Sequence, residues 1–177
     1  MKNTASLVYS WAIIGAGPAG LASAGLLLDS GVSPSDIIII DPEFAVGDFG
    51  RYWGEVFSNT TIELFMRFFT DIQCFHFSER QHAFPIESLP SDGHCQLKSV
   101  REPLQWITNH LRGRIDSLEG YASDLKVHDG AWSARVGDKT IRAEKVILAT
   151  GGTPKSLSYE GVNEISLYEA LNPSRLS

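Results

Sequence analysis

Three glycines near the N-terminus have the spacing of a phosphate-binding loop. Gly15, Gly17 and Gly20 form the pattern G-x-G-x-x-G within IIGAGPAGLASAG. Gly15 would permit a tight turn, Gly17 would let the backbone approach a pyrophosphate without a Cβ atom in the way, and Gly20 would let a helix pack close to a strand. Pro18 and Ala19 stand at the start of that helix, where exposed amides and the helix dipole attract anions. The spacing therefore favours pyrophosphate binding.

An acidic residue follows the next apolar run, as a dinucleotide-binding domain requires. The four isoleucines at 37–40 lead directly into Asp41. Its carboxylate would accept hydrogen bonds from the two ribose hydroxyls of an adenosine and would repel a 2′-phosphate. The site should therefore prefer FAD or NAD to NADP. A glycine triplet alone could equally be a turn beside a packed helix, but its combination with Asp41 favours dinucleotide binding.

The elements around the glycines form one strand–helix–strand unit. A strand is expected at 11–14, a helix at about 19–30 with Gly31 as its stop, and a second strand at 37–40. The uninterrupted isoleucines indicate a strand buried on both faces of a parallel sheet. On length alone, the uncharged run 11–28 could be a signal or membrane segment. Its glycines and proline make it a poor continuous helix, which argues against that alternative.

The rest of the chain predicts further helices and strands of a mixed fold. An aromatic-rich region at 42–96 is expected to be largely irregular, with a short helix around 62–69, and a second full helix is expected at 100–114. Tight-turn pairs at Asp129-Gly130 and Gly137-Asp138 then indicate a three-stranded antiparallel meander. The apolar segment 145–149 is expected to be a separate strand of the parallel sheet.

Composition excludes several classes of function. The net charge is -6 and the pI is near 5.3, with no basic cluster, so nucleic acid is not an expected partner. Cys74 and Cys95 form no CxxC pair, and the five histidines are scattered, so neither a metal site nor a redox-active disulfide is predicted. A reduced, cytoplasmic protein without a membrane segment is expected.

Two motifs together resemble the flavoproteins with two dinucleotide-binding domains, which include pyridine nucleotide-disulfide oxidoreductases and flavin-containing monooxygenases. The first motif is IIGAGPAGLASAG followed by DPE, and the second is KVILATGG at 145–152. The resemblance implies FAD as the cofactor. It further implies that the glycine motif, Asp41, Pro42 and Glu43 bind the ADP half, and that Thr150 and Gly151 pass close to the same cofactor.

A looser similarity covers residues 47–65, the region that faces the flavin in monooxygenase-like members. It implies that the side chains nearest the isoalloxazine ring or the pyrophosphate are Arg51, Tyr52, Trp53, Ser58 and Asn59. The glycine pair usual in the family is replaced by the sequence Gly47-Asp48-Phe49-Gly50. A packed aromatic loop without a role in binding is the alternative for this segment.

The resemblance implies a three-layer α/β Rossmann-like FAD-binding domain, with a parallel sheet, helices on one face and the meander on the other. We expect one domain over 1–177 with its motif core at 8–160, and the nicotinamide-binding domain of the family to be missing. The implied function is that of the N-terminal part of a flavin-dependent monooxygenase or NAD(P)H-dependent oxidoreductase acting on a small molecule. Two alternatives are a small FAD-binding subunit completed by a partner chain and a non-catalytic regulatory module that binds NAD or FAD.

Overall fold

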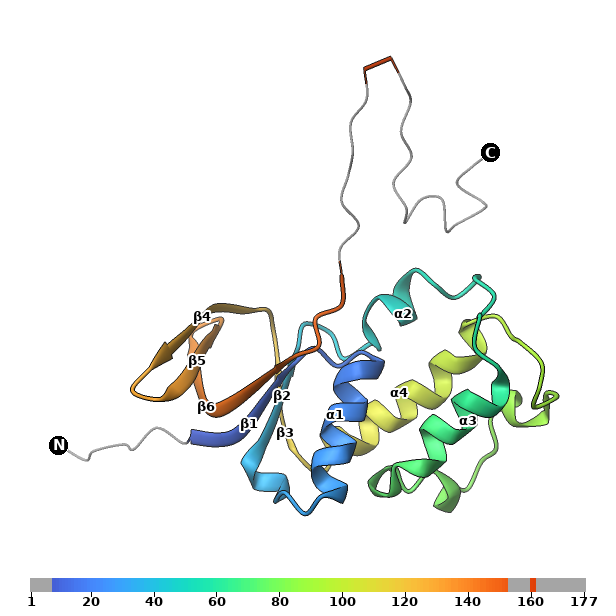
Figure 1. Cartoon of the computed structure of the whole chain (residues 1–177), viewed down its shortest axis with the longest axis horizontal. Helices are drawn as coiled ribbons and strands as arrows, with labels where there is room; N and C mark the ends of the chain where they lie inside the picture. The colour runs from blue at the N-terminus through green and yellow to red at the C-terminus, as the bar shows by residue number, and fades with distance from the viewer. Residues whose placement is uncertain (1–7, 153–159, 162–177) are drawn as a thin grey trace.

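A six-stranded mixed sheet, with helices packed on one side, forms the framework of the chain (Figure 1). The computed structural model describes residues 8–152, 160 and 161. The sheet order is β3-β2-β1-β6-β5-β4. The strands are β1 (Val8–Ile14), β2 (Ile37–Asp41), β3 (Asp116–Glu119), β4 (Ala122–His128), β5 (Ala131–Val136) and β6 (Lys139–Leu148). The helices are α1 (Pro18–Asp29), α2 (Gly47–Arg51), α3 (Ile62–Asp71) and α4 (Lys98–Arg112), with short 3-10 helices η1 (Pro34–Asp36), η2 (Gln73–Phe75), η3 (Phe77–Glu79) and η4 (Pro85–Ser88).

The parallel half of the sheet confirms the strand–helix–strand prediction. β1 lies between β2 and β6 and pairs with both in parallel. Trp11 lies opposite Ile37 of β2, and Ile14 lies opposite Leu148 of β6. The four isoleucines of β2 are at most 3% exposed, as expected for a strand covered on both faces. The uncharged run 11–28 divides into the end of β1, the glycine turn and most of α1. None of the helices in the described part of the chain is long and apolar enough to span a membrane.

Strand β6, which joins the parallel and antiparallel parts of the sheet, differs from the prediction. We expected the third meander strand and the segment 145–149 to be separate, but β6 is one strand from Lys139 to Leu148. Its first half pairs antiparallel with β5, and its second half pairs parallel with β1. The sequence indicated two strands because the first half of β6 is polar and its second half is apolar.

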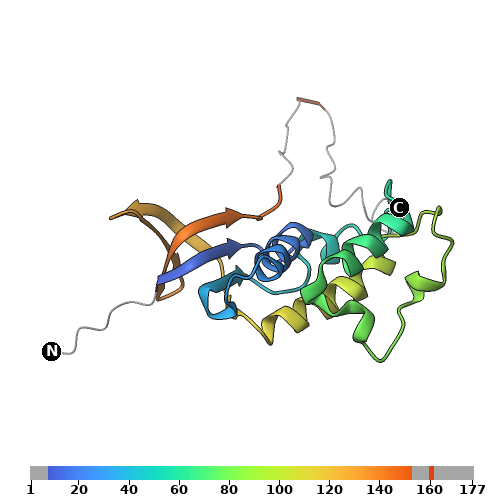
Figure 2. The same ribbon diagram turned by 60° about the horizontal axis from the view of Figure 1, so that its bottom comes forward.

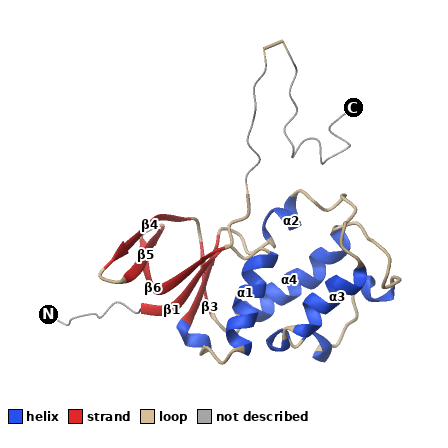
Figure 3. Cartoon of the chain, viewed as in Figure 1, coloured by secondary structure: helices blue, strands red, loops and turns tan. Residues whose placement is uncertain are grey.

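Two apolar clusters occupy the two faces of this sheet. The larger one joins Ile13, Ile37 and Ile39 to buried residues of α1, α3 and α4. On the other face, Ile38 and Ile40 pack in a cluster with Val136 of β5. Figures 2 and 3 show the helices gathered on one side and the β4–β5 hairpin curving away on the other. The expected three-layer arrangement is therefore present.

The helices at 62–71 and 98–112 confirm two further predictions, while α2, β3 and the 3-10 helices were missed. Because α4 begins at Lys98, Pro103 lies in its second turn rather than its first. The five-residue α2 and the strand β3 were not predicted, since neither GDFGR nor DSLE has an apolar period. The predicted domain limits of 1–177 extend beyond the described residues, and the single-domain assignment stays a prediction.

Candidate functional site

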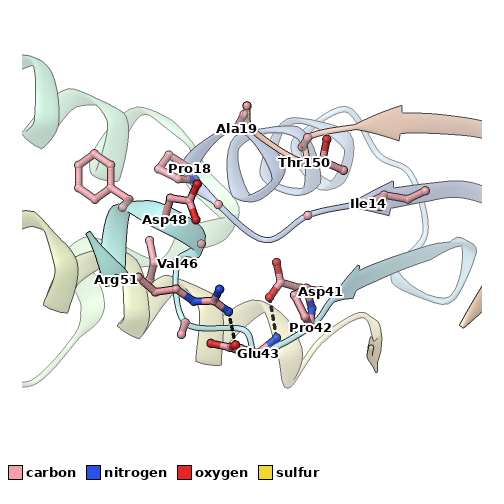
Figure 4. A pocket seen from close by; sticks show the side chains of 18 of the residues that line it. Ile14, Pro18, Ala19, Asp41, Pro42, Glu43, Val46, Asp48, Arg51 and Thr150 are labelled. Carbon is pink, nitrogen blue, oxygen red and sulfur yellow. Dashed lines mark hydrogen bonds and ion pairs between the residues drawn. The ribbon is translucent and has the colours of Figure 1, made fainter. Parts of the chain in front are cut away.

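A cavity of about 930 Å³ opens at the carboxyl ends of β1, β2 and β6, where the N-terminus of α1 meets helix α2 (Figure 4). Ligands in open α/β folds bind at this edge of the parallel strands. Four segments that are distant in sequence line the cavity together with Leu97, namely the glycine turn, residues 40–53, residues 120–122 and residues 148–152. The site is therefore built by the sheet and does not belong to one loop.

The three glycines of the motif have different surroundings. Gly15 has a φ of +107°, and a Cβ atom there would lie 2.3 Å from the carbonyl oxygen of Ala149. A Cβ atom on Gly20 would lie 1.9 Å from the carbonyl oxygen of Gly15. Gly17, by contrast, lines the cavity, and a Cβ atom there would meet nothing within 4 Å. Gly15 and Gly20 thus allow close packing, and Gly17 leaves open space.

The N-terminus of α1 points its first amides toward that open space. The first helical hydrogen bond runs from the amide of Leu21 to the carbonyl of Gly17 at 3.0 Å. The amides of Ala19 and Gly20 precede it and therefore have no partner within the helix. Pro18 occupies the first helical position, where its missing N–H costs nothing. These amides and the helix dipole favour an anion at Gly17.

The carboxylate of Asp41 ties two loops together beside the cavity. Its Oδ2 accepts a hydrogen bond of 2.8 Å from the amide of Ala16 in the glycine turn. Its Oδ1 accepts bonds from the amides of Glu43, at 3.0 Å, and Phe44, at 2.6 Å. Sequence reasoning missed this structural role, although an aspartate at the start of a turn commonly bonds amides two residues on.

The remaining acceptor capacity of Asp41 is limited but not exhausted. A carboxylate offers about four acceptor positions, and the three backbone amides occupy three of them. The residue is only 5% exposed, yet it lines the cavity. One acceptor position therefore remains, on Oδ2. Recognition of the two ribose hydroxyls by Asp41 stays a prediction.

The loop from β2 to α2 is held in an unusual backbone conformation. Phe44 and Val46 have φ angles of 51° and 64°, a region that costs a non-glycine residue about 1 to 3 kcal/mol. Both are almost fully buried. Gly47 follows with a φ of +59°, and a Cβ atom on it would lie 3.7 Å from the Cα atom of Gly17. This loop thus brings the start of α2 directly beside Gly17.

An ion pair between Glu43 and Arg51 borders the cavity (Figure 4). The hydrogen bond that the guanidinium donates to Glu43 raises the pKa of Arg51, so the guanidinium stays charged. Tyr52 and Trp53 line the same side.

The cavity includes most of the residues that the sequence singled out. Those among its lining residues are Gly15, Gly17, Pro18, Ala19, Asp41, Pro42, Glu43, Arg51, Tyr52, Trp53, Thr150 and Gly151. Gly20 lies behind it, and the structure does not bring Ser58 or Asn59 to the lining. Ser58 is buried with its Oγ donating to the carbonyl of Thr60, while Asn59 is exposed. The role of Ser58 and Asn59 beside a flavin stays a prediction.

Several lining residues carried no signal in the sequence. Val46, Leu97 and residues 120–122 reach the cavity only through the tertiary fold. Gly120 is placed there because its amide donates to the carbonyl of Asp41 at 3.0 Å, which continues the pairing of β3 with β2. The pairing itself depends on the polar strand β3, which the sequence did not reveal.

The two cysteines lie elsewhere and are buried as free thiols. Burial, with a smaller contribution from the charge of Asp29, raises the pKa of Cys74 to about 12. Burial also raises the pKa of Cys95. Since the thiolate is the reactive form, neither residue is prepared for disulfide exchange. Among the described residues, no group of histidine, cysteine and acidic side chains is arranged to hold a metal ion.

Known proteins share this fold. The FAD-bound form of OTEMO superimposes with a TM-score of 0.63 at 16% identity, over 89% of this chain and 28% of that chain. The bacillithiol disulfide reductase of Staphylococcus aureus gives a TM-score of 0.57 at 14% identity, over 81% of this chain and 38% of that chain. A thioredoxin reductase of Streptococcus pyogenes gives 0.54 at 16% identity, over 86% and 38%. At these identities the likeness concerns the fold alone.

Sequence comparison identifies the family. The monooxygenase AgnR1 of Paecilomyces divaricatus is 30% identical over 186 residues, which cover 93% of this chain and 46% of that protein. The chain thus spans less than half the length of these relatives. The family model described as pyridine nucleotide-disulphide oxidoreductase matches residues 9–172. With the glycine turn, Asp41 and the sheet that positions them, this match shows that the chain belongs to the pyridine nucleotide-disulphide oxidoreductase family.

Proposed function

We propose that this chain binds FAD as the cofactor-binding part of a flavin-dependent oxidoreductase. The observation that carries the proposal is the open space at Gly17, between the first amides of α1 and the start of α2. A pyrophosphate could approach the backbone there because Gly17 has no Cβ atom to occupy the space. No lysine is required, since backbone amides and the helix dipole supply the attraction.

The adenosine end is assigned to the Asp41 side of the cavity. Its free acceptor position on Oδ2 would take one ribose hydroxyl, and residues 120–122 border the same end. A 2′-phosphate would face the carboxylates of Asp41 and Glu43. Arg51, the basic residue among those that line the cavity, is already paired with Glu43. The site therefore suits FAD or NAD better than NADP.

The choice of FAD over NAD rests on the family and on strand β6. Membership of a flavoprotein family and the FAD-bound state of OTEMO support a flavin. The long β6 also brings Thr150 and Gly151 to the cavity beside Pro18 and Ala19, which supports their expected place near the cofactor.

The activity proposed for the whole protein is that of a monooxygenase or another NAD(P)H-dependent oxidoreductase. FAD would supply the redox chemistry, with a nicotinamide as reductant and a small molecule as substrate. The similarity to the monooxygenase of Paecilomyces divaricatus supports this branch of the family. The buried, poorly acidic thiols of this chain argue against disulfide exchange by its own cysteines. A cytoplasmic location stays a prediction.

Substitution of Gly17 tests the proposal. Gly17→Val should abolish FAD binding, because its side chain would project into the cavity, while folding stays intact, because the backbone is ordinary (φ −72°) and no protein atom is near. Gly113→Val is the matched control, since Gly113 also has an ordinary backbone (φ −78°), has no contact closer than 3.5 Å and lies away from the cavity. FAD binding would be followed by quenching of flavin fluorescence, and folding by circular dichroism. Unchanged FAD affinity in a folded Gly17→Val chain would refute the site.

A further inference from the structure

Helix α4 contacts the loop that follows Asp41, although α4 itself does not line the cavity. The Nε2 atom of Gln105 donates a hydrogen bond of 3.0 Å to the carbonyl of Phe44. The guanidinium of Arg112 lies 4.2 Å from the centre of the Phe44 ring. Phe44 is therefore held at both its backbone and its side chain by residues about two helical turns apart on α4.

Phe44 in turn fixes the carboxylate of Asp41. Its amide makes the shortest of the three bonds to that carboxylate, 2.6 Å to Oδ1. This bond needs the left-handed backbone of Phe44, with a φ of 51°, which a phenylalanine does not adopt without support. If Phe44 relaxes, Asp41 loses its shortest hydrogen bond, and with it a constraint on the orientation of its carboxylate.

We propose that Gln105 is a positioning residue for ribose recognition. By holding the carbonyl of Phe44, it keeps the Phe44 amide on Oδ1 of Asp41 and leaves the remaining acceptor position of Oδ2 available to a ribose hydroxyl. The inference rests on the proposed function and adds to it a residue that acts from outside the cavity, through Phe44.

Gln105 is better suited to this role than Arg112. The same Nε2 atom of Gln105 also lies 3.2 Å from Oδ1 of Asn109, one turn further along α4, which orients the amide group. The Arg112 side chain is 38% exposed and shares its charge with Glu119 at 3.8 Å. Arg112 therefore packs against Phe44 without controlling its backbone.

A pair of nucleotides separates a positioning role from a general loss of stability. ADP carries both ribose hydroxyls and 2′,3′-dideoxy-ADP carries neither, so the ratio of their dissociation constants measures only the hydroxyl contact. Calorimetric titrations would use the full chain after dialysis has removed bound flavin. A hydrogen bond to a charged acceptor predicts a preference for ADP of about tenfold or more in the unmodified chain.

Gln105→Leu should bring this ratio close to one while leaving the affinity for 2′,3′-dideoxy-ADP unchanged. Gln73→Leu is the matched control, because Gln73 also donates its Nε2 to a backbone carbonyl, that of Thr70, and does not line the cavity. It should keep the full preference.

Two results would overturn the positioning role while the proposed function stands. In the first, the Gln105→Leu chain keeps the preference for ADP. In the second, it loses affinity for ADP and for 2′,3′-dideoxy-ADP by the same factor. An unmodified chain that binds both nucleotides equally would refute ribose recognition by Asp41 and the positioning role with it. An unmodified chain that binds neither would contradict the proposed function itself.

Discussion

Asp41 combines a structural and a proposed binding role in one side chain. Its carboxylate accepts the amides of Ala16, Glu43 and Phe44, and thereby joins the glycine turn to the β2–α2 loop. The sequence revealed the position of this residue through its place after the isoleucines. It did not reveal the three backbone partners, because these depend on the left-handed backbone of Phe44 and Val46. Phenylalanine and valine are residue types that rarely adopt this conformation, so the sequence does not indicate it.

Asp41→Asn should therefore lower both stability and FAD affinity. The amide keeps one acceptor oxygen, but its NH₂ group cannot accept the bond from the buried amide of Ala16. The expected loss in free energy of unfolding is about 1.5 to 3 kcal/mol, measured by urea denaturation. Asp138→Asn, in an exposed turn, is the control and should change little. Equal stability of the two variants would show that the Ala16 bond contributes nothing.

The buried thiols lead to a prediction about reactivity. Because burial raises the pKa of Cys74 to about 12 and also raises that of Cys95, both should be almost fully protonated near pH 8. Iodoacetamide should label them slowly in the folded chain and rapidly in urea, as followed by mass spectrometry. An added Ser78→Cys residue at an exposed position should be labelled rapidly in both states. Rapid labelling of Cys74 in the folded chain would contradict the assignment.

Among the elements, β3 shows how the sheet compensates for a weak strand sequence. Asp116–Glu119 contains only one apolar residue, yet it pairs with β2 over its whole length. The hydroxyl of Tyr9, on β1, donates a hydrogen bond of 2.8 Å to the carboxylate of Asp116. Burial first, and this bond second, raise the pKa of Tyr9 to about 12.

The pairing of Tyr9 with Asp116 predicts a loss of stability at alkaline pH. The folded-state pKa exceeds the ordinary value of about 10, so the protonated phenol stabilises the fold below pH of about 10, and this contribution is lost as the pH rises toward about 12. Tyr9→Phe should be less stable than the parent at neutral pH, and the difference should shrink in this alkaline range. The measurement is urea denaturation at several pH values. Tyr121→Phe is the control, at a residue 74% exposed, and its stability should match that of the parent at every pH. If the stability of Tyr9→Phe ran parallel to that of the parent across this pH range, the linkage would be contradicted.

Elements with a clear apolar period were predictable, and those positioned by their neighbours were not. β1, β2, α1, α3 and α4 have such patterns, and each was found with small shifts at its ends. The short α2 forms where Val46 and Gly47 turn the chain beside Gly17, a contact between distant segments. The continuity of β6 was also hidden, since one strand serves two partners of opposite direction.

At the scale of the whole molecule, the cavity depends on contacts between distant parts of the chain. Residues 14–19, 40–53, 120–122 and 148–152 meet only because β1 lies between β2 and β6 and because β3 extends the parallel edge. The glycine spacing, Asp41 and the ILATGG segment were enough to identify many of the residues that the fold brings to this cavity. The sequence alone could not place Leu97 or Tyr121 at the same cavity, because neither belongs to a motif.

The central claim, that this cavity is built for FAD, is tested most directly by identifying the dinucleotide that the chain binds. The purified 177-residue chain would be incubated with an equimolar mixture of FAD, NAD and NADP, passed through a desalting column and denatured, and the released molecule would be identified by mass spectrometry. FAD should be recovered in near-stoichiometric amount with little NADP, because Asp41 and Glu43 would face a 2′-phosphate. Recovery of NAD in place of FAD, or of no dinucleotide from a folded chain, would contradict this claim.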